Sequence, residues 1–204
     1  MQGSAEGALR SWEQLLNPIK LRQNLVRASV FLAAYELLQT VVKGRPKAFF
    51  LVDVVDDPGP GYKGKVLRLH KDKFLASCLW LKSLDAIDAD DLKTLARIRR
   101  HRNEVAHELF QIVSGADREV QRGLLIDLMK IVAKIDQWWL REMELDEEDG
   151  FGDLHEIPDE EITSGNMMLL SMMLSMFDGD DSLLRDLHAA LMEAQPAIKR
   201  KASR

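Results

Sequence analysis

The residues best suited to chemistry in this chain lie in one short stretch, residues 99–110, which reads RRHRNEVAHELF. Arg102 and Asn103 stand together there, and His107 follows at the fifth position after the arginine. An imidazole, with an ordinary pKa of about 6.5, can accept or donate a proton near neutral pH. A guanidinium offers a planar fork of donors that matches two phosphate oxygens. These groups could cleave RNA without a metal, with His107 as general acid/base, Arg102 stabilising the charged phosphorane and Asn103 positioning them.

A helix over residues 90–113 must position these side chains. Apolar residues recur in it at helical spacing and predict one buried stripe: Leu95, Ile98, Val105, Leu109 and Ile112. Arg102 falls in the middle of that stripe, where leucine or isoleucine is expected. A guanidinium on a buried face is costly unless it is paired or opens into a wet cleft. Such a break in a local rule marks a candidate functional site.

The same helix carries a basic, polar ridge. Arg99, Asn103 and His107 are spaced i, i+4, i+8 and share one side of it. No acidic residue lies between Lys93 and Arg102. We expect this ridge to attract the phosphate backbone of RNA through Arg97, Arg99 and Arg100. Binding of this kind weakens strongly as the salt concentration rises.

The motif Arg102-Asn103-x-x-x-His107 resembles the R-x(4–6)-H signature of HEPN domains, which favour a polar residue directly after the arginine. The resemblance covers residues 17–144. It implies an all-helical bundle, usually dimeric, and a metal-independent endoribonuclease of toxin–antitoxin or antiphage systems. It also implies an antitoxin or another protein as a candidate partner.

The dimer is what the resemblance implies, and the helix pattern is compatible with it. Five positions on a straight helix set Arg102 and His107 roughly 140° apart, so a monomer aligns them poorly. A two-fold dimer with a shared cleft would supply two of each.

Two other interpretations compete with RNA cleavage. In the first, the chain is a dimeric, non-catalytic module that binds a protein or RNA. In that case Arg102 has only a structural role and pairs with a backbone carbonyl or with Glu36. If Glu36 does not pair with Arg102, it is a solvated carboxylate on its helix. In the second, Glu104-x-x-His107 has the spacing of carboxylate-bridged di-metal bundles. Such a site needs a second Glu-x-x-His, which the chain lacks, so no metal or cofactor is expected.

The distribution of charge is compatible with an RNA partner. The net charge is −5, but residues 142–161 hold eleven acidic residues and no lysine or arginine, so the remainder carries +6. As a hypothesis, this acidic segment lies over the basic helix and restrains it. The single Cys78 and the absence of a secretory signal predict a cytoplasmic protein without membrane contact.

Glycines, prolines and the spacing of apolar residues predict the remaining elements. Asn17 and Pro18 predict the start of a helix that runs to about Lys43, where Gly44 and Pro46 would stop it. Residues 48–70 are either a short β-hairpin around a turn or a helix extension followed by a loop. Further helices are predicted over residues 73–87, over 90–113 with Asp88 as N-cap, and from 117 to about 143.

The predicted organisation is an all-α, HEPN-like bundle over residues 12–144, an acidic linker over 145–163 and a C-terminal helical appendage over 164–204. The appendage has a helix over 164–177 with five methionines. That helix either packs on the body or its dimer mate, or offers an adaptable surface to a partner. A final helix is expected from Asp180 to Gln195, ended by Pro196.

Overall fold

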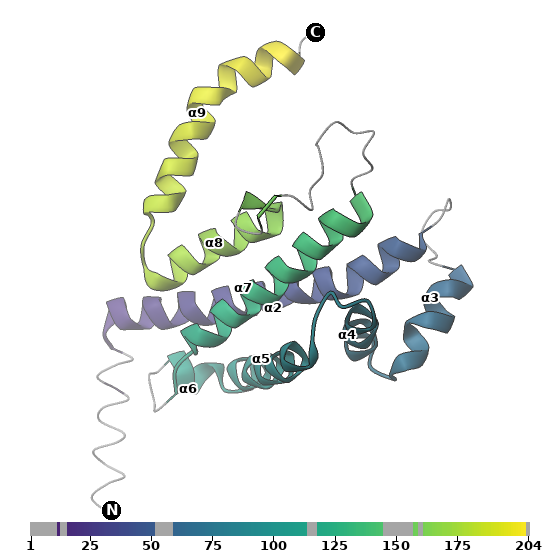
Figure 1. The fold of residues 1–204 in the computed structure, drawn as a ribbon. Helices are drawn as coiled ribbons and strands as arrows, with labels where there is room; N and C mark the ends of the chain where they lie inside the picture. Colours follow the sequence, from purple (N-terminus) through teal and green to yellow (C-terminus); the bar gives the residue numbers. More distant parts are fainter. Residues whose placement is uncertain are drawn as a thin grey trace, which may run out of the picture.

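The computed structural model describes residues 12, 16–51, 59–113, 118–144, 157, 158 and 161–202, with the side chains of 59, 143, 144 and 195–202 left out of the description. The fold is all-helical, as predicted, and the described residues contain no strand. The elements are α2 (Pro18–Phe50), α3 (Gly59–Lys65), a 3₁₀ turn (Leu67–Leu69), α4 (Lys73–Ser83), α5 (Ala89–His107), α6 (Leu109–Val113), α7 (Arg122–Trp139), a π turn (Leu140–Glu144), α8 (Gly165–Asp178) and α9 (Ser182–Ala202) (Figure 1).

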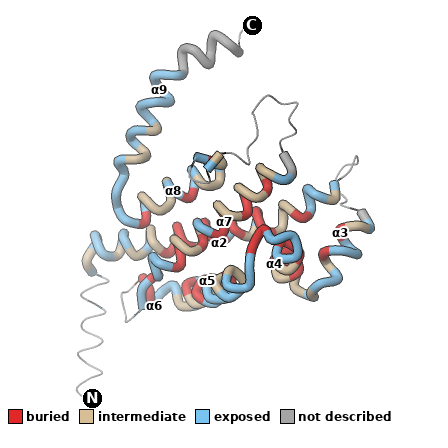
Figure 2. The backbone as a smooth tube through the Cα atoms, in the orientation of Figure 1, coloured by how far each residue is buried: buried red, intermediate tan, exposed pale blue. Residues whose placement is uncertain are grey.

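The other helices gather around α2, which is 33 residues long and contacts α3 through α8. It begins as predicted: the side-chain oxygen of Asn17 accepts hydrogen bonds from the N–H groups of Ile19 and Lys20, and Pro18 follows the cap. By length and composition α2 could also cross a membrane. In the bundle many of its apolar residues belong to the buried core, and buried positions are red along the backbone tube in Figure 2.

The prediction that α2 stops at Gly44 and Pro46 is wrong, because the helix continues to Phe50. Pro46 removes one intrahelical hydrogen bond but is itself buried. Beyond it, the rings of Phe49 and Phe50 pack on Trp80 of α4, with centroids 5.2 and 5.9 Å away. Aromatic burial at this end offsets the local cost of the proline.

Residues 48–70 match neither alternative in full: the helix extension is confirmed over residues 48–50, but a helix and a 3₁₀ turn are found where a loop was predicted. Residues 48–50 belong to α2, residues 59–65 form α3, and residues 67–69 form the 3₁₀ turn. No strand of the expected hairpin is found in these residues, and 52–58 lie outside the described part of the chain.

The motif helix begins as predicted but ends earlier. Asp88 caps α5 in a capping box with Asp91. The helix then stops at His107, and after Glu108 the short α6 sets off separately. This break turns Ile112 and Val113 toward α2, where both are buried, and leaves Leu109 39% exposed. Leu109 was therefore wrongly placed on the buried stripe, because the stripe assumed one straight helix.

The Met-rich helix α8 packs on the body of this same chain, against α2 and α7. Its Leu170 and Phe177 belong to the same buried cluster as the core of α2 and α7. At its start, the fully buried carboxylate of Asp136 accepts hydrogen bonds from Ser164 and Asn166, at 2.7 and 2.9 Å. The expected boundary before residue 164 therefore does not separate two cores.

By contrast, α9 leaves the bundle after a left-handed Gly179 and projects away from it (Figure 1). All of its described side chains are exposed or half-buried (Figure 2). The prediction that Pro196 ends this helix is wrong, because α9 runs past it to Ala202.

If α8 is part of the core in solution, Leu170→Ala should lower the free energy of unfolding by about 2–5 kcal/mol, because Leu170 is fully buried. The neighbouring Leu169→Ala, at a site 39% exposed, should cost less than ~1 kcal/mol. Urea denaturation of both variants measures the difference. Equal losses would show that α8 is not docked.

Candidate nucleic-acid site

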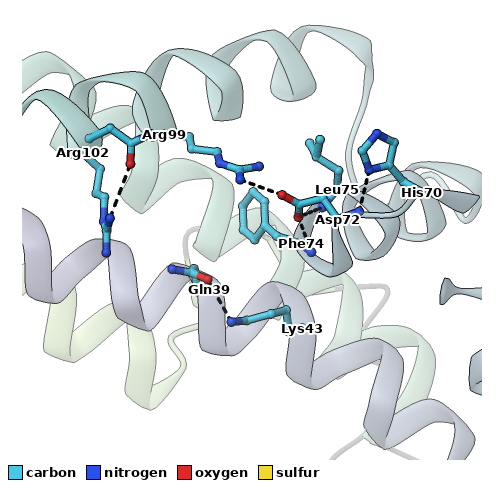
Figure 3. Close-up of polar contacts among 9 residues, drawn as sticks. Gln39, Lys43, His70, Asp72, Phe74, Leu75, Arg99 and Arg102 are labelled. Carbon is cyan, nitrogen blue, oxygen red and sulfur yellow. Dashed lines mark hydrogen bonds and ion pairs between the residues drawn. The ribbon is translucent and has the colours of Figure 1, made fainter.

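A cavity of about 320 Å³ lies between α2, α4 and α5 and contains part of the predicted motif. Its lining residues are Tyr35, Gln39, Lys43, Asp72, Lys73, Phe74, Arg99, Arg102 and Asn103. Four of these are cations and one is a carboxylate, so the cavity is positively charged. Figure 3 shows Arg102 pointing from α5 toward α2 and Arg99 extending to Asp72, with Gln39 and Lys43 on α2 opposite them.

Arg102 occupies the inward slot that the sequence indicated, but it is only half-buried. Its Nη2 lies 3.2 Å from Oε1 of Glu36, so Glu36 is an ion-pair partner across the bundle. The guanidinium also stacks over the Tyr35 ring, 5.4 Å from its centroid, and its Nη1 lies 3.4 Å from Oδ1 of Asn103. The Nε atom is buried and has no hydrogen-bond partner among the described residues. Ion pair, ring and cavity together explain how a cation is tolerated at this position.

Arg99 is held by Asp72, whose carboxylate lies 2.6 Å from Nη2. Burial by itself would raise the pKa of Asp72, but hydrogen bonds from Arg99 and from the N–H groups of Leu75 and Phe74 hold that pKa below its ordinary value. The same ion pair raises the pKa of Arg99. Asp72 caps α4, so this charged pair fastens α5 to the start of α4 and fixes one wall of the cavity.

The two lysines of the cavity were missed by the sequence analysis. Lys43 donates to Oε1 of Gln39 at 2.9 Å, and Lys73 has no ion pair with the described residues. Both lie on helices other than the motif helix, so no spacing within the sequence connected them to Arg102. The only signal for them is that each neighbouring helix places a basic residue toward α5. That signal becomes visible only when the packing of the helices is known.

His107 lies outside the cavity. It is the last residue of α5, is exposed, and has no hydrogen bond or ion pair with the described residues. Asn103, one helical turn earlier, is exposed and lines the cavity. Arg102 and Asn103 are thus brought together within one chain, whereas the imidazole stands apart at the end of the helix.

The three arginines expected to bind RNA are divided between two places. Arg99 lines the cavity, whereas Arg97 and Arg100 are exposed on the surface of α5 and do not line it. They can meet a phosphate backbone only outside the cavity.

His101, immediately before Arg102, is buried and has a structural role. Its Nε2 accepts a hydrogen bond from the N–H of Gln121 at 3.0 Å, so Nδ1 carries the proton that faces Oε2 of Glu104 at 3.2 Å. Its ring packs edge-on against Phe31, 5.0 Å between centroids. The side chain therefore connects α5 to the start of α7 and is not available to a ligand in the cavity.

Other chemistries find little support in the described residues. No group of three or more His, Cys, Asp or Glu side chains there could hold a metal ion. Cys78 is buried, and burial raises the pKa of its thiol to about 12, so it does not form a nucleophilic thiolate near neutral pH.

Because His101 is buried and accepts a partly buried hydrogen bond from the Gln121 N–H, His101→Phe should lower the free energy of unfolding by ~0.5–1.5 kcal/mol. His107→Phe, at an exposed site, should change it by less than ~0.5 kcal/mol. Thermal or urea unfolding of the two variants compares them directly. A similar loss in both would contradict the distinct roles.

No protein-family model, curated protein or solved structure matches this chain. The resemblance to HEPN domains therefore stays a prediction that rests on the motif and on the all-helical fold around it. Function has to be argued from the arrangement of charges around Arg102.

Proposed function

We propose that this protein is a cytoplasmic, metal-independent endoribonuclease of the HEPN type, acting as a homodimer. Its RNA would bind at the cavity between α2, α4 and α5. The observation that supports this most is the half-buried guanidinium of Arg102, which has Asn103 beside it on the wall of a cavity lined by four cations. A buried Nε without a partner leaves that guanidinium with an unused donor.

The proposed reaction uses the RNA's own 2′-hydroxyl as nucleophile. One His107 imidazole accepts the 2′-OH proton as the oxygen attacks phosphorus, and a second imidazole protonates the departing 5′-oxygen. The Arg102 fork stabilises the charge that develops on the phosphorane, and Asn103 orients the phosphate. The products are a 2′,3′-cyclic phosphate and a 5′-hydroxyl.

Substrate binding requires a change of partner at Arg102. Glu36 now pairs with the guanidinium, and its side chain is 60% exposed. An ion pair exposed to this degree contributes about 0–1 kcal/mol, so a phosphate can replace the carboxylate at low cost.

A second subunit is needed because one chain does not complete the site. His107 lies outside the cavity that contains Arg102 and Asn103. Two and three residues after it, Leu109 is 39% exposed and Phe110 is 73% exposed. A large exposed aromatic side chain three residues after His107 favours an interface with a second copy there, because interfaces are enriched in aromatic residues. A two-fold axis near Phe110 would bring two imidazoles to the two Arg102 sites.

The direct test is RNA cleavage in EDTA by wild type, His107→Ala and Arg102→Ala. We expect each variant to cleave about 100-fold more slowly or worse, because one loses the acid/base and the other the charge stabilisation. His188→Ala, an exposed histidine on α9, is the matched control and should cleave like wild type. The cyclic phosphate ends of the products identify the mechanism.

Two outcomes would count against this mechanism. Cleavage by wild type that stops in EDTA would indicate a metal site. No cleavage of any RNA by wild type, with folded protein and intact dimers, would favour the non-catalytic alternative.

The dimer is tested separately with Phe110→Glu. A charge at the centre of an apolar contact should prevent association, so sedimentation analysis should give a monomer and cleavage should be lost together with the dimer. Lys82→Glu, at an exposed position on α4, serves as a charge control. A Phe110→Glu protein that remains dimeric and active would place the interface elsewhere.

The alternative function, a dimeric interaction module without catalysis, is favoured by α9. This helix projects from the body and leaves Leu191 58% and Met192 51% exposed. The exposed apolar side chains of this amphipathic helix could bind an antitoxin or another regulatory protein. Both functions are compatible with a toxin or stress-response effector, and the cleavage assay separates them.

A further inference from the structure

The cavity has positive charge on helices other than the motif helix, from residues that have no part in the proposed catalysis. Lys43 comes from α2 and Lys73 from the first position of α4, and both line the same 320 Å³ cavity as Arg99 and Arg102. Cations from three helices therefore surround one concave space. A cavity of this volume is at the small end of ligand sites in proteins, which suits a group such as a phosphate.

The four cations are not equally neutralised. Arg99 forms an ion pair with Asp72, and Arg102 forms one with Glu36. Neither lysine has a carboxylate partner among the described residues, and the hydrogen bond of Lys43 is to the neutral side chain of Gln39. The excess positive charge of the cavity is thus concentrated on Lys43 and Lys73.

Gln39 orients Lys43. Its Oε1 accepts from the Lys43 ammonium at 2.9 Å, one helical turn away on α2. This hydrogen bond directs the ammonium along the side of α2 that lines the cavity, as Figure 3 shows. The amide neutralises no charge, so the ammonium keeps its full attraction for an anion.

We propose that Lys43 and Lys73 form a second phosphate subsite, which binds a backbone phosphate of the RNA next to the one held by Arg102. This rests on the proposed function, because RNA is the source of the phosphates. Two phosphates held on opposite walls would fix the direction of the strand across α5. Binding at this subsite needs one chain only and does not involve His107.

The test separates binding from cleavage by using a 2′-O-methyl oligonucleotide, which has no 2′-hydroxyl to attack phosphorus. Its affinity is measured by fluorescence anisotropy across a range of salt concentrations for wild type and for Lys43→Gln/Lys73→Gln. Loss of two charged contacts should weaken binding about tenfold. It should also reduce the slope of log Kd against log salt by about 1.4, the value for two contacts to a single strand.

Lys82→Gln/Lys130→Gln is the matched control. It removes the same charge from exposed positions at the far end of α4 and on α7, outside this cavity. Affinity should then change less than about twofold, since distant exposed charges are screened by salt. Circular dichroism and the melting temperature confirm that both double variants are folded.

Each remaining outcome has a definite meaning. Equal losses in the two double variants, or no binding of the oligonucleotide by wild type, would overturn the subsite. Direct binding of inorganic phosphate or pyrophosphate, measured by calorimetry, to a protein that does not bind the oligonucleotide would show a small-anion site and overturn it too. Lysine-dependent binding without any RNA cleavage by wild type would support the subsite and refute the proposed catalysis.

Discussion

The placement of the Arg102 guanidinium in the seam between α5 and α2 is the constraint on which the site depends. A cation at an inward helical position has to be compensated, and here Glu36 and the face of Tyr35 do so. The ion pair contributes about 0–1 kcal/mol and the ring contact about 0.5–1 kcal/mol, and the guanidinium remains partly exposed to a ligand. The result is a charged group whose position is fixed by packing and whose donors are not all used.

Two further contacts of α5 hold Arg102 in that position. Arg99 is tied to Asp72 at the start of α4, and His101 is tied to Gln121 at the start of α7. Both contacts precede Arg102 by less than one helical turn, and they reach two different helices, so α5 is fixed in rotation as well as in position. Rigid elements of this kind locate a side chain more precisely than a loop can.

The opposite side of α2 supplies stability. There α7 and α8 bury an apolar core, and Arg45 pairs with the buried Asp136, which also accepts from the start of α8. A buried carboxylate with its partners in place fixes one arrangement of three helices, because any other would leave a charge unpaired. The central helix α2 thus packs in the core and also contributes Tyr35, Gln39 and Lys43 to the lining of the cavity.

Local rules predicted the parts of this structure that depend on neighbours in the chain. Asn17 and Asp88 were identified as caps from their side chains, and Arg102 stood out because it interrupts an apolar period. Tertiary packing decided the rest. Aromatic contacts carried α2 past Pro46, and burial of Ile112 broke the motif helix at Glu108.

The site was predictable only in part, for the same reason. The helical period placed Arg102 and Asn103 on a wall of what proves to be a cavity, and it raised Glu36 as a partner for Arg102. It could not find Lys43 or Lys73, because they belong to other helices. It also could not tell the exposed His107 from the buried His101, since burial depends on where α7 begins.

The central claim is that two copies of this chain bring an imidazole to a phosphate held by Arg102. A crystal structure of the wild-type protein with a 2′-O-methyl oligonucleotide tests it most directly. The account predicts a two-fold dimer with a backbone phosphate about 3 Å from the Arg102 fork and a His107 ring within hydrogen-bond reach of the same phosphodiester. A monomer, or an oligonucleotide bound away from α5 with both His107 rings in solvent, would contradict it.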